Sequence, residues 1–313
     1  MGKNDQQPSA TGVYAALLTP RRPYSTEADC AILLDYLDLI TRTGVDGVVL
    51  FGSTGEFVHF DTAERMRLAM LAIRRSRAPV LVNVSHSTLA GAIALAEHAI
   101  TARAAGVLLM PPYFYRYTDT QIFEFYRHFV NSIGRAIPVY LYNLPFFTNP
   151  ISAGLAERLF GLGAFAGIKD SSGDWQMFEA LRSYRAARPF SLLVGHESVY
   201  LRAALAGADG IISGVAAALP ELLVAMNRVI RSPAPEQAQR LNIRLQEFVA
   251  WIEKFPATTA IRRAAIARGW KLDHFALPLD EKTSENLAAF ERWFQNWLPS
   301  ALSECAAGAH VRA

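Results

Sequence analysis

Eight short segments of the chain are apolar along their whole length instead of alternating apolar with polar positions. Such unbroken runs are typical of parallel strands that are covered on both faces. Stretches of helix length, rich in alanine and leucine, lie between them, and several end in glycine, which tolerates the left-handed conformation after a helix. The predicted strands span residues 13–19, 46–52, 79–85, 106–111, 137–143, 165–170, 190–195 and 209–213.

The alternation of strands and helices predicts the fold class. Eight successive strand–helix units indicate an α/β protein built as a (β/α)8 TIM barrel, a fold of roughly 250 residues. A doubly wound open sheet is the alternative, but no glycine-rich phosphate-binding turn follows the first strand. Beyond the barrel the sequence predicts a C-terminal helical extension, with helices over residues 236–254, 257–268 and 284–297.

The same patterns predict how the chain is divided. No linker isolates a second domain, so the last three helices are expected to pack on the barrel. We expect a flexible N-terminal tail at 1–11, the barrel at 12–232, the three-helix extension at 233–300 and a second flexible tail at 301–313.

Composition excludes several classes of function. The 313 residues are 51% hydrophobic and 19% charged, as in a globular protein with a large core. The net charge is +3 without basic runs interleaved with aromatics, so nucleic acid is not an expected partner. No apolar stretch reaches the ~20 residues of a membrane span, and no secretory signal is evident. Cys30 and Cys305 lie far apart in sequence, which favours free thiols and a cytoplasmic location.

The use of lysine draws attention to one position. Only five of the 31 basic residues are lysines, and Lys169 is the one at the end of a predicted strand. Burial disfavours the charged form of an amine, and a neutral amine can condense with a ketone to a Schiff base. Arginine cannot do so because it stays protonated. An ion pair with the neighbouring Asp170 is the structural alternative.

Other candidates lie where predicted strands end, which is where barrel enzymes build their active sites. The turn Gly52–Glu56 offers two hydroxyls and backbone N–H groups to a small carboxylate. Tyr142, on the strand before that of Lys169, is a candidate proton carrier, and His196 and Glu197 are candidate partners of a polyol. The structural alternatives are an ordinary strand-to-helix turn at 52–56, a tyrosine packed in the core at 142, and side chains that face solvent at 196 and 197. No set of residues has metal-ligand spacing, so no metal or other cofactor is expected. Together these groups fit a 2-oxo acid such as pyruvate.

Three motifs, in this order, resemble those of the dihydrodipicolinate synthase/N-acetylneuraminate lyase family of class I aldolases. They are Gly52-Ser53-Thr54-Gly55-Glu56, Tyr142-Asn143-Leu144-Pro145 and Gly167-Ile168-Lys169-Asp170, and the resemblance covers residues 12–300.

The resemblance implies roles for individual residues. Lys169 would form the Schiff base and Tyr142 would shuttle protons. Ser53 and Thr54 would hold the substrate carboxylate, with Ser53 also contacting the tyrosine. The family is usually a homotetramer, a dimer of dimers. Further substrate-binding positions implied are Gly52, Ile212, Ser213, Glu197, Ser198 and Phe114.

Departures from the family pattern bear on the substrate. Residues 146–149, Phe-Phe-Thr-Asn, lack the arginine with which the synthases grip the carboxylate of aspartate semialdehyde. Phe114 falls where one subunit usually lends a tyrosine to its neighbour. Glu197 and Ser198 align with the segment that binds the polyol tail in the sialic-acid lyase. We therefore expect a hydroxylated substrate that is shorter than sialic acid.

Three functions follow as hypotheses. The first is aldol cleavage or condensation, or dehydration, of a 2-oxo-3-deoxy sugar acid through a Lys169 imine, with pyruvate and an aldehyde as partners. The second is 4-hydroxy-tetrahydrodipicolinate (dihydrodipicolinate) synthase, in which Arg116 is the candidate for the missing cation. The third is a barrel that binds a 2-oxo acid without turnover, for which Phe114 is the only supporting feature.

Overall fold

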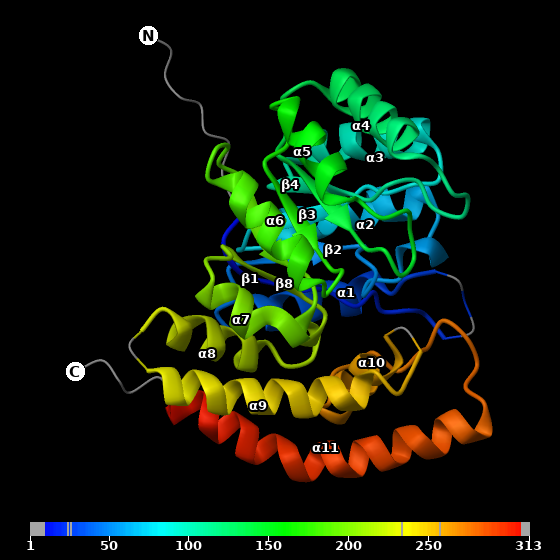
Figure 1. Cartoon of the computed structure of the whole chain (residues 1–313). Helices are drawn as coiled ribbons and strands as arrows, with labels where there is room; N and C mark the ends of the chain where they lie inside the picture. Colours follow the sequence, from blue (N-terminus) through cyan, green and yellow to red (C-terminus); the bar gives the residue numbers. More distant parts are fainter. Residues whose placement is uncertain (1–9, 24, 26, 233, 257, 308–313) are drawn as a thin grey trace. The chain divides into compact units, whose positions relative to one another are not determined.

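The computed structural model describes residues 10–23, 25, 27–232, 234–256 and 258–307. Eight parallel strands form a closed barrel in the order β1 to β8, with helices between successive strands (Figure 1). This confirms the predicted TIM barrel, and every predicted strand is present. The strands are β1 (Gly12–Ala16), β2 (Gly47–Leu50), β3 (Val80–Asn83), β4 (Gly106–Leu109), β5 (Val139–Asn143), β6 (Gly167–Asp170), β7 (Ser191–Val194) and β8 (Gly210–Ser213).

Six helices of the barrel begin at a side chain that accepts a hydrogen bond from the first turn. Such caps satisfy backbone N–H groups that have no partner inside the helix. Asp29, Asp61, Thr88, Thr118, Ser152 and Asp174 act in this way. The helices are α1 (Cys30–Thr41), α2 (Thr62–Arg75), α3 (Leu89–Ala102), α4 (Asp119–Ile133), α5 (Ala153–Gly161), α6 (Trp175–Arg185), α7 (Tyr200–Leu205) and α8 (Pro220–Ile230).

The described residues fall into two compact units. The first contains those of Met1–Gly12 and Val80–Ile212, and the second those of Val13–Pro79 and Ser213–Ala313. Within the first unit α4 packs against α3 and α5, and α5 against α6. Within the second, α1 packs against α2, and α8 against the C-terminal helices. Of the predicted site residues, Tyr142 and Lys169 belong to the first unit, and Ser53 and Thr54 belong to the second.

The C-terminal extension consists of α9 (Pro235–Ile252), α10 (Thr259–Ala267) and α11 (Glu281–Ala307). Helices α9 and α11 lie side by side, with Phe248 stacked against the ring of Trp297 (Figure 1). No helix among the described residues has the length and apolar character needed to cross a membrane.

Two predicted boundaries are corrected. The tail expected at 301–313 is helical up to Ala307, because Ala301 and Cys305 are buried and Glu304 pairs with Arg244. Pro299 lies inside α11 without ending it. At the other end Ala10 is buried, and its N–H donates to Tyr140 Oη at 2.9 Å, so the tail expected at 1–11 is fixed there. Positions 1–9 and 308–313 of these predicted tails, and position 257 of the predicted second helix, lie outside the described residues.

Candidate active site

Lys169 and Tyr142 lie side by side in the first unit. The register between β5 and β6 pairs Tyr142 with Lys169, and neighbouring in-register residues point to the same face of a parallel sheet. Lys169 Nζ donates to Tyr142 Oη at 3.1 Å and lies 4.1 Å from the centre of the phenol ring. Only 3% of Lys169 and 1% of Tyr142 is exposed. The amine and the phenol are therefore within proton-transfer distance in a site shielded from water.

Asp170, the next residue along β6, is not the partner of Lys169. Its carboxylate accepts from Asn143 Nδ2 at 2.7 Å and from Ser172 Oγ at 2.8 Å. Asn143 in turn accepts the N–H of Ile151 at 2.9 Å. Burial raises the pKa of the Asp170 carboxyl, and the hydrogen bonds from Ser172 and Asn143 oppose that rise only in part. In the described part of the chain Lys169 and Asp170 form no ion pair, so the structural alternative for Lys169 is not supported.

Ser171 was missed by the sequence analysis. It is 3% exposed, and its Oγ has no hydrogen-bond partner among the described residues. A methyl group added at Gly195 would overlap Ser171 Oγ and come within 2.8 Å of Lys169 Cε. The Ser171 hydroxyl and the Lys169 side chain therefore both pack against Gly195. Strand alternation, which places residues i and i+2 on one face, was the available signal. A buried hydroxyl without a partner is costly, which suits a group that bonds a ligand.

The residues after β7 make contacts of their own. Glu197 begins the short 3-10 helix η2 (Glu197–Val199), and Ser198 is exposed, with its Oγ 2.8 Å from His196 Nδ1. The His196 ring lies 6.4 Å from that of Phe146. Because β7 pairs with β6, these residues follow the strand next to that of Lys169. Their contact with a substrate remains a prediction.

The loops after β4 and β5 are joined by one side chain. Asn149 Nδ2 donates to the carbonyls of Pro112 at 2.6 Å and Tyr115 at 2.8 Å. Phe114, in the loop so held, has a φ of +82° and is 88% exposed, with its ring edge against Tyr115. Its role in substrate binding stays a prediction. Arg116 donates to the carbonyl of Thr148 at 3.2 Å.

The predicted carboxylate-binding turn lies in the second unit, after β2. Thr54 is 7% exposed, and its Oγ1 would lie 2.9 Å from a methyl group added at Gly214, which follows β8. A methyl group added at the buried Gly52 would meet none of the described atoms within 4 Å, so there is space beside this backbone. The contact expected between Ser53 and Tyr142 stays a prediction.

Two residues at the ends of this turn have unusual backbones. Phe51 has a φ of +57° and Glu56 a φ of +52°, which is rare for residues other than glycine. Such conformations persist only where surrounding contacts impose them, and they concentrate at functional sites. On β8, Ile212 and Ser213 are buried, and Ser213 Oγ accepts the N–H of Ala216 at 3.1 Å.

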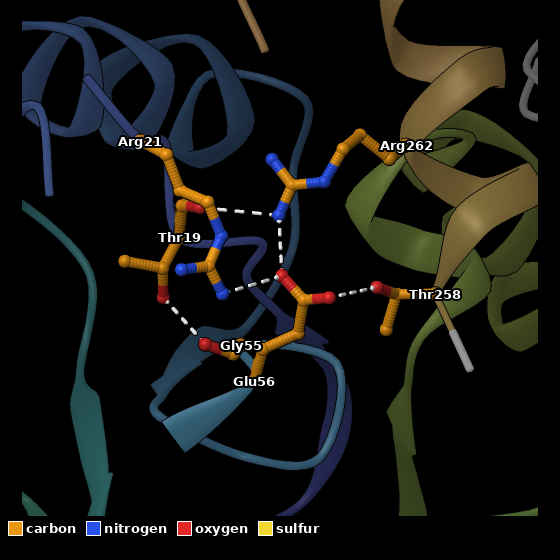
Figure 2. A network of polar contacts seen from close by, with 6 residues as sticks. All are labelled: Thr19, Arg21, Gly55, Glu56, Thr258 and Arg262. Carbon is orange, nitrogen blue, oxygen red and sulfur yellow. Dashed lines mark hydrogen bonds and ion pairs between the residues drawn. The ribbon is translucent and has the colours of Figure 1, made fainter. Parts of the chain in front are cut away.

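The last residue of the turn, Glu56, is the centre of a polar network (Figure 2). One carboxylate oxygen accepts from Arg262 at 2.8 Å and Arg21 at 3.2 Å, and the other from Thr258 at 3.0 Å. Burial alone would raise the pKa of Glu56, but the charges of Arg262 and Arg21, with hydrogen bonds from Arg21 and Thr258, lower it below its ordinary value. Sequence reasoning treated Glu56 only as the end of a motif. No three histidine, cysteine or acidic side chains in the described ranges are grouped to hold a metal.

Comparison with known proteins identifies the family. A sequence model of the dihydrodipicolinate synthetase family matches residues 9–296. The chain therefore belongs to this family, whose members are class I, Schiff-base-forming lyases and aldolases, and it is an enzyme of that class.

Individual relatives carry different names. The chain is 28% identical to a 4-hydroxy-tetrahydrodipicolinate synthase of Methanothrix thermoacetophila over 88% of this chain and 93% of that one. It is 29% identical to a probable 2-dehydro-3-deoxy-D-pentonate aldolase, YjhH, of Escherichia coli K12 over 82% of this chain and 87% of that one. Among solved structures, the family member YagE of E. coli K12 in complex with pyruvate has a TM-score of 0.85 and 25% identity, with 92% of this chain and 98% of that chain covered. Similarity therefore fixes the family but not the substrate.

Proposed function

We propose that this lyase cleaves or forms the C3–C4 bond of a 2-oxo-3-deoxy sugar acid, with pyruvate as the keto-acid component. The observation that carries the proposal is the buried Lys169 amine, which lies 3.1 Å from the Tyr142 hydroxyl and has no acidic partner among the described residues. An amine in that environment is suited to nucleophilic attack and has a proton carrier beside it.

Lys169 Nζ attacks C2 of the substrate, water leaves, and a protonated imine forms. The imine withdraws electrons while Tyr142, as phenolate, takes the proton of the C4 hydroxyl. The C3–C4 bond then breaks to give an aldehyde and an enamine, which is protonated at C3 and hydrolysed to pyruvate and free lysine. A dehydratase would use the same imine to acidify C3 and expel a hydroxyl group as water.

Other residues are proposed to bind the substrate. Ser53 and Thr54 hold its carboxylate, with Gly52, Ile212 and Ser213 bordering the keto acid and Phe114 contributing at the loop after β4. Glu197 and Ser198 bind the hydroxylated part. The buried Ser171 hydroxyl beside Lys169 is proposed to bond a polar group of the substrate. We also propose a cytoplasmic homotetramer, on the family resemblance and on the two free cysteines.

A second candidate is 4-hydroxy-tetrahydrodipicolinate synthase, which the similarity to the Methanothrix enzyme favours. It needs a cation for the second carboxylate, and Phe146 and Phe147 are 66% and 68% exposed where the synthases have an arginine nearby. Arg116, in the loop after β4, is the candidate for that cation, and its guanidinium already donates to the carbonyl of Thr148. We therefore rank this function below the sugar-acid lyase.

The test is to trap the imine. The protein is incubated with pyruvate, reduced with borohydride and digested, and the adduct is located by peptide mass spectrometry. We expect a reduced pyruvyl group on Lys169 and none on Lys254, the internal control, which lies over the ring of Trp251. An adduct on another lysine, or none with pyruvate and longer 2-oxo acids, would overturn the proposal.

The two candidate functions are then separated with the second substrate. The protein is supplied with pyruvate and either aspartate semialdehyde or a short hydroxyaldehyde, and product formation is followed. Faster turnover of the hydroxyaldehyde supports the sugar-acid lyase. Faster turnover of aspartate semialdehyde selects the synthase instead.

A further inference from the structure

We propose that Glu56 is a positioning residue for the Ser53–Thr54 turn, and that helix α10 is, through Glu56, a structural part of the site that holds the substrate carboxylate. The identity of the ligand, pyruvate, rests on the function proposed above. The role of Glu56 rests on the contacts around it, all of which lie within one compact unit.

The turn needs external support. It lies between two non-glycine residues in the left-handed conformation, Phe51 and Glu56, and neither backbone is favourable by itself. The ring of Phe51 packs in the core, 1% exposed. Glu56 is held differently, because its side chain is 11% exposed and receives three polar contacts. The two ends of the turn are thus fixed by burial on one side and by ion pairs on the other.

Two of the three contacts on Glu56 come from α10 and the residue before it. Thr258 precedes the helix, and Arg262 lies on it with a side chain that is only 1% exposed. Arg262 also donates to the carbonyl of Thr19 at 3.1 Å. Thr19 closes the network by donating to the carbonyl of Gly55, inside the turn, at 2.8 Å (Figure 2). The helix is therefore connected to the turn by two routes.

Helix α10 also packs near Thr54, the residue expected to bind the carboxylate. Thr54 and Ile261, which also lies on α10, pack against the same glycine: a methyl group at Gly214 would lie 2.9 Å from Thr54 Oγ1 and 3.4 Å from Ile261 Cδ1. A shift of α10 would thus act on the turn both at Thr54 and at Glu56. Binding groups that are displaced by a fraction of an ångström lose much of their effect.

A simpler role for the network would be to attach α10 to its unit without effect on the ligand. The same helix offers a matched control for that possibility. Arg268, at its C-terminus, donates to Glu221 at 2.6 Å and to the carbonyl of Ala218 at 2.7 Å. This ion pair also attaches α10, but it has no contact with Glu56 or the turn.

The experiment compares Glu56→Gln, Thr258→Val and Arg268→Met with wild type. Glu56→Gln keeps the shape of the side chain and removes its charge, and Thr258→Val removes a single hydrogen bond and is the mildest variant for folding. The concentration of pyruvate that gives half-maximal borohydride trapping on Lys169 is measured, together with KM and kcat. Hydrogen–deuterium exchange of the peptide covering 51–57 is measured in all four proteins.

We expect Glu56→Gln to raise the half-saturating pyruvate concentration about tenfold and Thr258→Val about threefold, with kcat changed less than about twofold. Exchange over 51–57 should rise in both and stay at the wild-type level in Arg268→Met. Unchanged exchange and half-saturation in Glu56→Gln would overturn the proposal, as would an equal effect of Arg268→Met. Absence of pyruvate trapping in wild type would count against the proposed function alone, because the exchange comparison still tests the role of Glu56.

Discussion

Two ionisable side chains of this protein that are largely shielded from solvent, Lys169 and Glu56, have opposite surroundings. The amine of Lys169 meets a phenol and no acid among the described residues, whereas the carboxylate of Glu56 receives two guanidinium groups and a hydroxyl. A buried charge with several partners is stabilised in its charged form and held in place. A buried amine without a counter-ion is left free to react. This contrast agrees with the roles proposed above, in which Lys169 reacts with the substrate and Glu56 supports the turn.

The largest expected effect tests the reactive side of this comparison. Lys169→Arg keeps a cation at the position but cannot form an imine. We expect the borohydride adduct to disappear and turnover to fall by at least about 1,000-fold. The measurements are peptide mass spectrometry and kcat/KM, with thermal unfolding as the control for folding. Turnover within tenfold of wild type would contradict a Schiff-base mechanism.

A smaller effect is expected from the phenol. Tyr142→Phe removes the hydroxyl that accepts from Lys169 and leaves the ring beneath the amine. We expect kcat to fall about 100- to 1,000-fold, because general acid–base groups contribute effects of this size. The adduct on Lys169 should still form, only more slowly. An unchanged kcat would show that another group carries the proton.

The supporting side of the comparison is tested by stability. Arg262→Met removes one partner of a nearly buried ion pair and leaves Glu56 with Arg21 and Thr258. We expect the free energy of unfolding in urea to fall by about 3 kcal/mol. The double variant Arg262→Met/Glu56→Gln should lose less than the sum of the single variants, because the two residues interact. Additive losses would mean that Arg262 and Glu56 contribute to the free energy of unfolding independently of each other.

The smallest expected effect is on the pH dependence of stability, to which the carboxyl groups of Glu56 and Asp170 contribute with opposite signs. The pKa of Glu56 is lowered in the fold, so its stabilising contribution is present above its ordinary value of 4.5 and is lost as the pH falls through the folded value. The pKa of Asp170 is raised, so its contribution is present below 3.8 and is lost as the pH rises through the folded value.

These signs are checked by measuring Tm against pH. Glu56→Gln should reduce the loss of Tm between about pH 5 and about pH 3, and Asp170→Asn should reduce any loss as the pH rises from about 4 to about 6. Identical pH profiles for wild type and both variants would contradict the two shifts.

Most of the fold was predictable because its determinants are local. An unbroken apolar run is enough to identify a buried parallel strand, and all eight were found in this way. The pairing of Tyr142 with Lys169 was also within reach, since neighbouring strands of a parallel barrel end at the same edge. Ser171 was within reach too, because it lies two residues after Lys169 and strand alternation places such residues on the same face.

The network around Glu56 was not predictable from the sequence. Its partners Arg21, Thr258 and Arg262 have no pattern that distinguishes them from other arginines and threonines of the chain. The left-handed backbone of Phe51 could not be foreseen either, because an aromatic residue disfavours it. The extent of α11 beyond Pro299 depends on burial of Ala301 and Cys305, which is again a tertiary effect.

Glu56 and Arg262 are 206 residues apart in the sequence. This separation affects the order in which the contacts around the turn can form during synthesis of the chain. A ribosome releases the N-terminal part of a chain first, and domains begin to fold as they emerge. The strands that carry Tyr142 and Lys169 are complete long before α10 is made. The contacts of Glu56 with Thr258 and Arg262 can form only after all eight strands of the barrel have been made. A chain that stops before α10 would thus contain the Lys169 amine but lack the contacts that hold Glu56, so the support of the turn depends on a segment made well after the strands of the barrel.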